Sequence, residues 1–284
     1  MCDFFGPSKS EGPSHGDEFP IGWHPHRGFD IATYLVEGVG RHADSMGNRE
    51  TFTAPGMQWC SVGSGIEHAE GGGTAEGDNT TGFQIWVNVP AGNKMDDPAY
   101  GTVPADRLPV VQLPHGVVAR VLAGPLGDVT GPFSTKTAVQ MIHWEIPAGA
   151  EVAHDVPADL DNAMTFVFRG DVTVPGAQPV GEEERKSEKI GSQQVGRFDA
   201  ANTETRTIRL VGGPSGAGVM LFAGKMLKQP IAWRGPIVMS TADEVAAAFA
   251  ELRAGTFPPV RAPFNYKRLS DFPADHPARV AVSQ

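Results

Sequence analysis

Cysteine is scarce in this sequence, and its scarcity excludes two kinds of protein. Among 284 residues the cysteines are Cys2 and Cys60, too few for a disulfide framework and without a CxxC motif. Long apolar runs are also missing, since none approaches the roughly 20 residues that cross a bilayer as a helix. The opening residues, MCDFFGPSKSEGPSHG, have neither the basic nor the apolar region of a signal peptide. We therefore expect an intracellular protein in a reducing compartment.

An excess of positive charge is missing as well. The chain has 23 Lys and Arg against 33 Asp and Glu, a formal net charge of −10. Binding to nucleic-acid phosphates depends on a basic face, so we expect no direct contact with DNA or RNA. The densest charged stretch, GEEERKSEK at 181–189, mixes both signs and is typical of a solvated loop.

Glycine and proline are plentiful, with 35 and 24 residues, and they are scattered rather than periodic. They bound short segments rich in Val, Ile, Thr and aromatic residues, a pattern typical of strands in a sandwich or barrel. The clearest segments are DIATYLVEG (30–38), GFQIWVNVP (82–90), AMTFVFRGDVTV (163–174), TRTIRLVG (205–212) and GVMLFAGK (218–225). The length suits two domains or one large β domain.

One segment departs from the strand pattern. In STADEVAAAFAELRAG, Thr241 is followed three residues later by Glu244, which is the spacing of a capping box. Apolar residues then recur at helical spacing, and Gly255 is placed to end the helix. The sequence predicts a helix over 241–254.

A weak internal similarity points to duplication. TYLVEGVG at 33–40 resembles TFVFRGDV at 165–172, with Gly38 matching Gly170, at an offset close to half the chain length. Two copies of one β unit would explain both the length and the strand content.

Two histidine-containing pairs carry the chemistry. HPH places His24 and His26 one residue apart, and IEHAE does the same with His68 and Glu70. Residues i and i+2 of a strand point to the same side, so each pair aims its donors at one point. If the two strands are neighbours, three imidazoles and a carboxylate converge, a set that suits Fe(II), Mn, Ni, Cu or Zn. The alternative is a loop that carries two imidazoles by chance.

The remaining histidines are expected to have other roles. His42 and Asp44 form an HxD pair, which we interpret as surface strand or as support for the site, outside the ligand set. The isolated histidines are expected to be structural or solvated: His15, His115, His143, His154 and His276.

The sequence resembles the pirin family of the cupin superfamily over nearly its whole length. The blocks that carry the resemblance are HPHRGFDIATYLVEG, DSMGN, PGMQWCSVGSGIEHAE, FQIWVNVPAGNKMDDPAY and GKMLKQPIAWRGPIVMSTADEVAAAFAELRAGTF. It implies an all-β fold of two cupin barrels placed face to face. We place an N-terminal metal-binding domain at 1–114 and a C-terminal domain, with the helix and tail, at 115–284. It further implies one iron per chain, Fe(II) or Fe(III), held by His24, His26, His68 and Glu70.

Two activities are associated with this family. The first is a dioxygenase of the quercetin 2,3-dioxygenase type, a quercetinase, in which Glu70 would accept the hydroxyl proton of a flavonol. An aromatic pocket could then be lined by Trp23, Phe29, Met57 and Trp59. The second is a redox-sensitive regulator, cytoplasmic and nuclear, that binds transcription factors. A change of metal charge near Arg27 and Arg41 would bias its surface. We expect a monomer in either case.

Three further expectations follow from comparing the chain with the family pattern. The positions equivalent to His24 and His26 in the second half are Val156 and Ala158, so no second metal site is expected there. The chain begins later than pirins generally do, so the first barrel is either completed differently or left with an open edge. The stretch GGGTAEGDNTTG after Glu70 predicts a mobile loop that admits a ligand.

Overall fold

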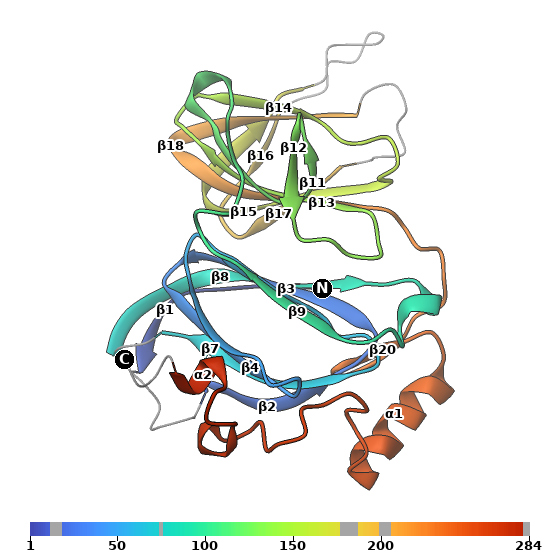
Figure 1. The fold of residues 1–284 in the computed structure, drawn as a ribbon. Coiled ribbons are helices and arrows are strands. Elements are labelled where there is room, and N and C mark those ends of the chain that lie inside the picture. The colour runs from blue at the N-terminus through green and yellow to red at the C-terminus, as the bar shows by residue number, and fades with distance from the viewer. Residues whose placement is uncertain (12–18, 74–75, 177–186, 199–205, 281–284) are drawn as a thin grey trace. The chain divides into compact units, whose positions relative to one another are not determined.

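The computed structural model describes residues 1–284 except 12–18, 74–75, 177–186, 199–205 and 281–284. The chain forms two compact units, drawn in Figure 1. Unit 1 comprises Met1–Arg107 together with Leu227–Gln284, and unit 2 comprises Leu108–Met226. The sequence-based boundary at 114/115 assigned the C-terminal helix and tail to the second domain. The structure groups them with unit 1 instead, because they pack on strands near the N-terminus.

Unit 1 contains a five-stranded antiparallel sheet in the order β1-β8-β3-β6-β9. Its strands are β1 (Cys2–Glu11), β8 (Glu76–Asn88), β3 (Phe29–Glu37), β6 (Met57–Ser61) and β9 (Ala99–Val103). The N-terminal residues thus form a strand at the edge of this sheet, paired with β8.

A four-stranded antiparallel sheet in the order β2-β7-β4-β5 completes the barrel. Its strands are β2 (Ile21–His26), β7 (Ile66–Gly72), β4 (Val39–Asp44) and β5 (Arg49–Thr53). The expected loop after Glu70 is largely strand, since β7 runs to Gly72 and β8 begins at Glu76. The expectation of a loop is wrong for the residues of the two strands, because glycine-rich and polar residues can continue a hairpin whose backbone hydrogen bonds are satisfied across the ladder. Residues 74–75 of the stretch lie outside the described residues.

Alternation of side chains along the strands builds the interior of unit 1. Phe29 and Ile31 of β3 pack with Cys60 of β6 and with Ile66 of the opposite sheet, and all four are buried. The two sheets therefore share one core, in which each strand contributes every second residue.

The C-terminal segment of unit 1 adds the hairpin β19 (Ala232–Arg234) and β20 (Ile237–Met239), followed by α1 (Ala242–Ala254). Thr241 accepts a hydrogen bond from the backbone N–H of Glu244, whose side chain accepts from the Thr241 N–H. Gly255 adopts the left-handed conformation at the C-terminus of α1. The predicted helix, its capping box and its C-cap are confirmed, because each depends on residues close in sequence. The tail adds α2 (Pro277–Val280).

Unit 2 is a nine-stranded antiparallel arrangement around one large core. Its main path runs β10-β11-β13-β18-β15-β16, with β12 on β11, β14 on β18 and β17 on β15. The strands are β10 (Val110–Gln112), β11 (Val118–Leu126), β12 (Val129–Pro132), β13 (Val139–Ile146), β14 (Glu151–Asp155), β15 (Asn162–Val174), β16 (Glu188–Ile190), β17 (Gln194–Phe198) and β18 (Thr207–Gly224). The two strands predicted at 205–212 and 218–225 are one long strand, β18. Short 3₁₀ turns complete the two units: η1 (Ala91–Asn93), η2 (Pro114–Gly116) and η3 (Leu269–Asp271).

The internal similarity has a structural counterpart. Gly38 follows β3 with φ of 91°, and Gly170 lies within β15 with φ of 70°. A Cβ at Gly38 would lie 2.2 Å from the carbonyl oxygen of Asn79, and one at Gly170 would lie 2.0 Å from that of Gly216. Both positions therefore require glycine, for its positive φ and for close approach of the neighbouring strand.

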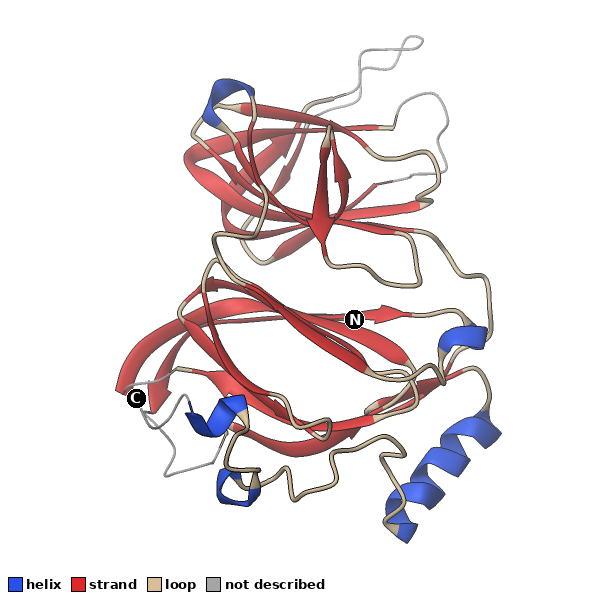
Figure 2. Cartoon of the chain, viewed as in Figure 1, coloured by secondary structure: helices blue, strands red, loops and turns tan. Residues whose placement is uncertain are grey.

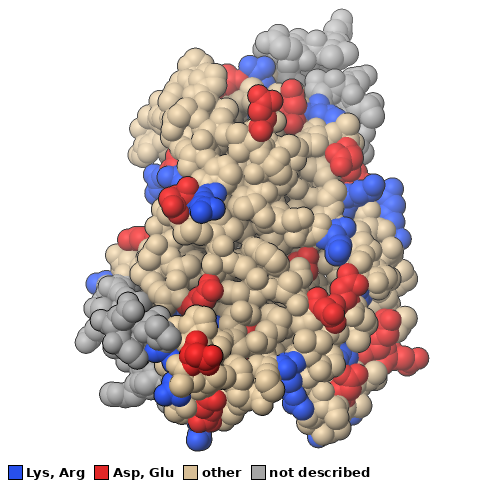
Figure 3. All heavy atoms as spheres, in the orientation of Figure 1, with Lys and Arg blue, Asp and Glu red and all other residues tan. Residues whose placement is uncertain are grey.

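Strands are the predominant regular structure of both units (Figure 2), which confirms the predicted all-β class. Among the described residues, none of the helices combines the length and apolar character needed to span a bilayer. On the face shown in Figure 3, acidic and basic side chains are intermixed. His15 and residues 181–186 of the charged stretch lie outside the described residues.

Candidate metal centre

The two histidine-containing pairs lie on adjacent strands, as the sequence analysis required. His24 and His26 are on β2, His68 and Glu70 are on β7, and His24 is directly opposite His68 in the antiparallel register. Since alternate residues share a face, all four side chains belong to the inner face of this sheet. The irregularity between Ile21 and His24 lies next to the site, a frequent position for β-bulges.

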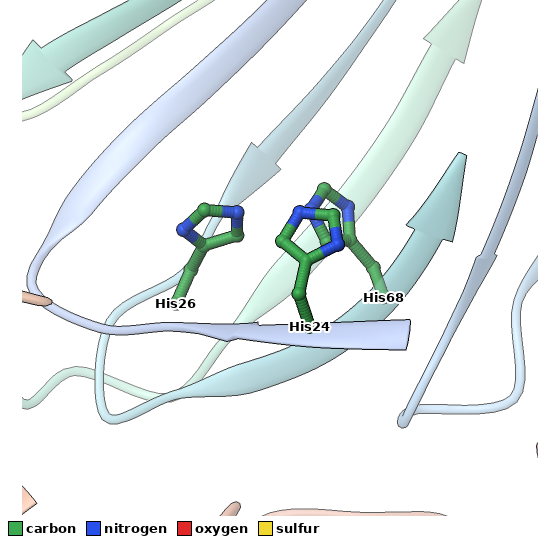
Figure 4. Close-up of side chains that lie close together, drawn as sticks. All are labelled: His24, His26 and His68. Carbon is green, nitrogen blue, oxygen red and sulfur yellow. The ribbon is translucent and has the colours of Figure 1, made fainter. Parts of the chain in front are cut away.

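The three imidazoles converge (Figure 4), with His24 and His26 rising from one strand toward His68 on the next. One ring nitrogen from each lies within 4.8 Å of the others. The Nε2 atoms of His24 and His68 are 2.8 Å apart, and Oε1 of Glu70 is 4.0 Å from Nε2 of His68. The three imidazoles thus lie close together, and Glu70 lies beside His68.

Backbone carbonyls orient two of these rings. Nδ1 of His24 lies 2.8 Å from the carbonyl oxygen of Gly22, and Nδ1 of His26 lies 3.3 Å from that of Pro236. A carbonyl only accepts, so each Nδ1 carries the hydrogen and each Nε2 keeps its lone pair. This tautomer, fixed by a partner on the opposite nitrogen, is the form in which histidine ligates a metal. The donor set therefore fits a metal ion such as iron.

Burial keeps His26 and His68 neutral. It lowers the pKa of His26 from 6.5 to about 3, with a further lowering by neighbouring His24. Burial and the positive charge that other imidazoles would carry likewise hold the pKa of His68 well below its ordinary value. Neutral imidazole is the ligand form, so both rings stay ready to bind a cation well below neutral pH.

Glu70 is the one carboxylate of the set, and its pKa has opposing influences. Burial raises the pKa of Glu70, whereas His42, His24 and a hydrogen bond from Gln84 lower it. Nε2 of Gln84 donates to Oε1 of Glu70 at 2.5 Å. A carboxyl group whose charged form is penalised by burial is a stronger base once it is ionised.

The hydrogen bond to Glu70 is the end of a longer chain. Tyr100 donates to Gln58 at 3.3 Å, Gln58 to Thr33 at 3.3 Å, and Thr33 to Gln84 at 2.5 Å. Gln84 then donates to Glu70. Each residue in this series donates to the next, so the series ends at Glu70, which only accepts. The hydrogen bonds therefore fix the orientation of the Glu70 carboxylate. These residues belong to the five-stranded sheet, opposite the sheet of β2 and β7. Spacing along the sequence therefore does not predict that they reach Glu70.

His42 and Asp44 are also part of the site interior, and both are fully buried. Of the two interpretations of this pair, surface strand is wrong and support for the site fits the structure, because β4 pairs with β7 and places His42 opposite Glu70 and Asp44 opposite His68. Asp44 accepts from His42 Nε2 at 3.1 Å and from the backbone N–H groups of Met46 and Asn48. The HxD spacing of His42 and Asp44, like the HxH and HxE spacings, predicts two side chains on the same face of a strand.

Two aromatic rings contact His26. Phe29 lies 5.4 Å and Trp86 lies 5.1 Å from it, between ring centroids, and both rings are nearly perpendicular to the imidazole. Phe29 had been predicted as a lining residue, whereas Trp86 had been considered only as part of a strand. Trp86 also packs 4.3 Å from Phe29, so the two form one aromatic wall.

The other predicted lining residues do not join this wall. Trp23 packs against Tyr266 of the tail, at 5.3 Å between ring centroids. Strand alternation places Met57 and Trp59 on the face of β6 opposite Cys60. Alternation also places Trp23 on the opposite face from its neighbour His24.

Arg27 is not a surface residue. Its side chain is 2% exposed, donates to both carboxylate oxygens of Glu251 in α1 and donates to the carbonyl oxygen of Ser64 at 2.7 Å. Arg41 lies over the ring of Phe19 at 5.8 Å. Arg27 therefore has no free surface through which a change of metal charge would act on a partner.

Histidines of unit 2 have partners of their own. His154 lies 2.8 Å from the side-chain oxygen of Gln140, and His143 lies 3.1 Å from the carboxylate of Glu145. Each is thus placed in a local polar contact. Among the described residues, both groups of three potential ligands close enough to share a metal ion are in unit 1.

Comparison with known proteins identifies the family. A model of the pirin family matches residues 1–87, and a model described as the pirin C-terminal cupin domain matches residues 141–258. A protein of Pseudomonas aeruginosa named "Putative quercetin 2,3-dioxygenase" is 32% identical over 246 residues, covering 84% of this chain and 81% of that protein. Human pirin is 27% identical over 231 residues, covering 81% of this chain and 75% of human pirin.

Solved structures agree on the fold. A quercetin 2,3-dioxygenase from Acinetobacter baumannii superposes with a TM-score of 0.79 at 24% identity, covering 90% of this chain and 85% of that one. A bacterial pirin from Escherichia coli, solved in complex with nickel(II), has a TM-score of 0.54 at 23% identity, with 72% and 77% covered. The all-β architecture is therefore that of a protein with two cupin domains. With both halves matched by its models, this chain belongs to the pirin family.

Proposed function

We propose that this protein is an iron-dependent dioxygenase of the quercetin 2,3-dioxygenase type, acting on a flavonol or a similar aromatic hydroxyketone. The observation that carries the proposal is the convergence of three imidazoles, two of them oriented by backbone carbonyls, with Glu70 on the same sheet face. The ligands would be His24, His26, His68 and Glu70. A bound redox-active ion would supply a Lewis acid for the substrate oxygens and a route to dioxygen chemistry.

The protein residues have separable tasks in this reaction. His24 and His26, held by carbonyls through Nδ1, would ligate the ion through their Nε2 lone pairs. Glu70, a carboxylate fixed by Gln84, would accept the proton of the substrate hydroxyl and so increase the electron density of the ring.

The aromatic wall supports a substrate of this class. Phe29 and Trp86 pack around His26, and rings of this kind bind flat aromatic ligands by offset or edge contacts. The name of the Pseudomonas aeruginosa relative points to the same substrate class. Nickel, present in the E. coli pirin, is a second metal that three imidazoles and a carboxylate accommodate.

The regulator that binds transcription factors is the alternative that the family resemblance implies. Its proposed charge switch depended on Arg27, which is buried and paired with Glu251. This observation favours the enzyme. We further propose that the protein acts as a monomer on a small molecule.

Anaerobic loading with Fe(II), a count of metal per chain and oxygen uptake with quercetin test the proposal. We expect one iron per chain and oxygen consumption that depends on quercetin. Glu70→Gln should keep part of the metal and lose most of the turnover, because it removes the base. One iron without oxygen uptake would refute the quercetinase and favour the regulator. Unchanged turnover in Glu70→Gln would remove Glu70 as the base.

A further inference from the structure

We propose that His42, Cys60 and His68 form a second, inner metal site for a thiophilic ion such as Zn²⁺, Cd²⁺ or Cu⁺. One ligand atom from each of the three lies within 4.8 Å of the others, and all three residues are buried. The set differs from the three-histidine group in containing a sulfur donor. His68 is common to both sets.

His42 has the orientation of a metal ligand. Its Nε2 lies 3.1 Å from Oδ2 of Asp44, and since a carboxylate accepts, Nε2 carries the hydrogen. The lone pair is then on Nδ1, which is buried and has no hydrogen-bond partner among the described residues. A carboxylate that orients a histidine for metal binding through the opposite nitrogen is a recurrent arrangement. A buried acceptor with no partner costs free energy, and a cation would remove that cost.

Several contacts keep His42 in place. The ring of Tyr100 stacks on it, with 4.3 Å between centroids and 11° between planes. Asp44, in turn, is held by the backbone N–H groups of Met46 and Asn48 and by the Asn48 side chain. A histidine in solvent has no such set of contacts to fix the position of its ring. These contacts fix the His42 ring, one nitrogen of which lies within 4.8 Å of the ligand atoms of Cys60 and His68.

Cys60 reaches the cluster from the opposite sheet, on β6, and is a free cysteine. Two imidazole nitrogens and a sulfur favour Zn²⁺ or Cu⁺ over Mg²⁺, Ca²⁺ or Mn²⁺, which prefer oxygen. Binding exchanges the thiol proton for the ion: the S–H bond breaks, a sulfur–metal bond forms, and the proton leaves to solvent. No electron is transferred, so no oxidant or reductant is needed.

His68 links the two sites. Its Nε2 faces His24, and its Nδ1 has no hydrogen-bond partner among the described residues. Binding two ions at once would require removal of the single N–H proton of the neutral His68 ring, to form a bridging imidazolate. We therefore expect the two sites to compete for His68. A thiophilic ion held by Cys60 would remove His68 from the outer site, which is the ligand set of His24, His26, His68 and Glu70. The inner site would then make the protein sensitive to such ions.

Titration of the metal-free full-length protein with Cd²⁺ tests this inference through the ultraviolet charge-transfer band between thiolate and cadmium. We expect the band in the wild type and its loss in Cys60→Ser and Cys60→Ala. Cys2→Ser is the matched control, because it removes the other cysteine, and it should keep the band. His24→Ala, which alters only the outer set, should keep it too.

The outcomes separate the two sites. Absence of the band in the wild type, its retention in both Cys60 variants or its loss in Cys2→Ser would overturn the inner site. Nickel(II) binding in the Cys60 variants shows that they are folded and that the outer site is intact. If His24→Ala loses nickel binding and the wild type shows no thiolate–cadmium band, the outer site is supported and the inner site is refuted.

Discussion

The contact between Arg27 and Glu251 is expected to hold α1 against the metal-binding strand, and Glu251→Gln tests it. Arg27 is 2% exposed and directly follows His26, whereas the Glu251 side chain is 37% exposed. Removing one partner of a fully buried pair costs about 3–5 kcal/mol, and an exposed pair is worth about 0–1 kcal/mol. With one partner buried and one partly hydrated, we expect a loss of about 2 kcal/mol.

The assay is amide hydrogen exchange followed by mass spectrometry, read over residues 242–254 of α1 and over residues 24–30. A loss of about 2 kcal/mol corresponds to roughly 30-fold faster exchange through local opening, since about 1.4 kcal/mol is a factor of ten. The matched control is Glu151→Gln, which makes the same change in the exposed pair with Arg209 of unit 2. It should change exchange by less than about threefold, as expected for a surface ion pair.

Equal amide exchange rates in Glu251→Gln and in the wild type would refute this prediction. They would mean that the Glu251 carboxylate contributes no stability through its contact with Arg27. Arg27→Met combined with Glu251→Gln provides a second check. The double variant should be less destabilised than the sum of the two single variants, since no buried charge is left without a partner. Metal retention should fall with Glu251→Gln, because the opened segment contains His26.

Three further predictions concern the site itself. His24→Ala should lose stoichiometric metal, measured by elemental analysis, while exposed His115→Ala retains it; full metal in His24→Ala would contradict the site. Gln84→Leu removes a hydrogen bond that lowers the pKa of Glu70, so the rising limb of the pH–rate profile should move to higher pH; an unmoved limb would contradict the assigned base. The pKa of His26 is lowered from 6.5 to about 3, so the unfolded chain binds the proton first as the pH falls. Stability of the metal-free protein, complete well above pH 6.5, should therefore have dropped by about 1.4 kcal/mol at pH 5.5 from His26 alone. Urea unfolding at about pH 8.5 and at pH 5.5 measures this, and an equal drop in His26→Gln would assign it to other groups.

Part of the site was predictable from spacing alone. The HxH and HxE pairs needed only the two-residue repeat of a strand, and the register of β2 on β7 brought them together. His42 and Asp44 share that repeat, but the sequence could not show that β4 pairs with β7 on its other side. Cys60 and Gln84 come from the opposite sheet, and no local pattern indicates which residues of two sheets meet.

By itself the sequence determined the strand content, the capped helix and the two histidine-containing pairs, because each depends on residues no more than a few positions apart. The tertiary structure alone decided how distant segments combine. It paired the first residues with β8, brought residues 227–284 into unit 1 and placed Glu251 against Arg27. Such contacts close loops of up to hundreds of residues, and they are selected by the packing of whole faces rather than by any local preference.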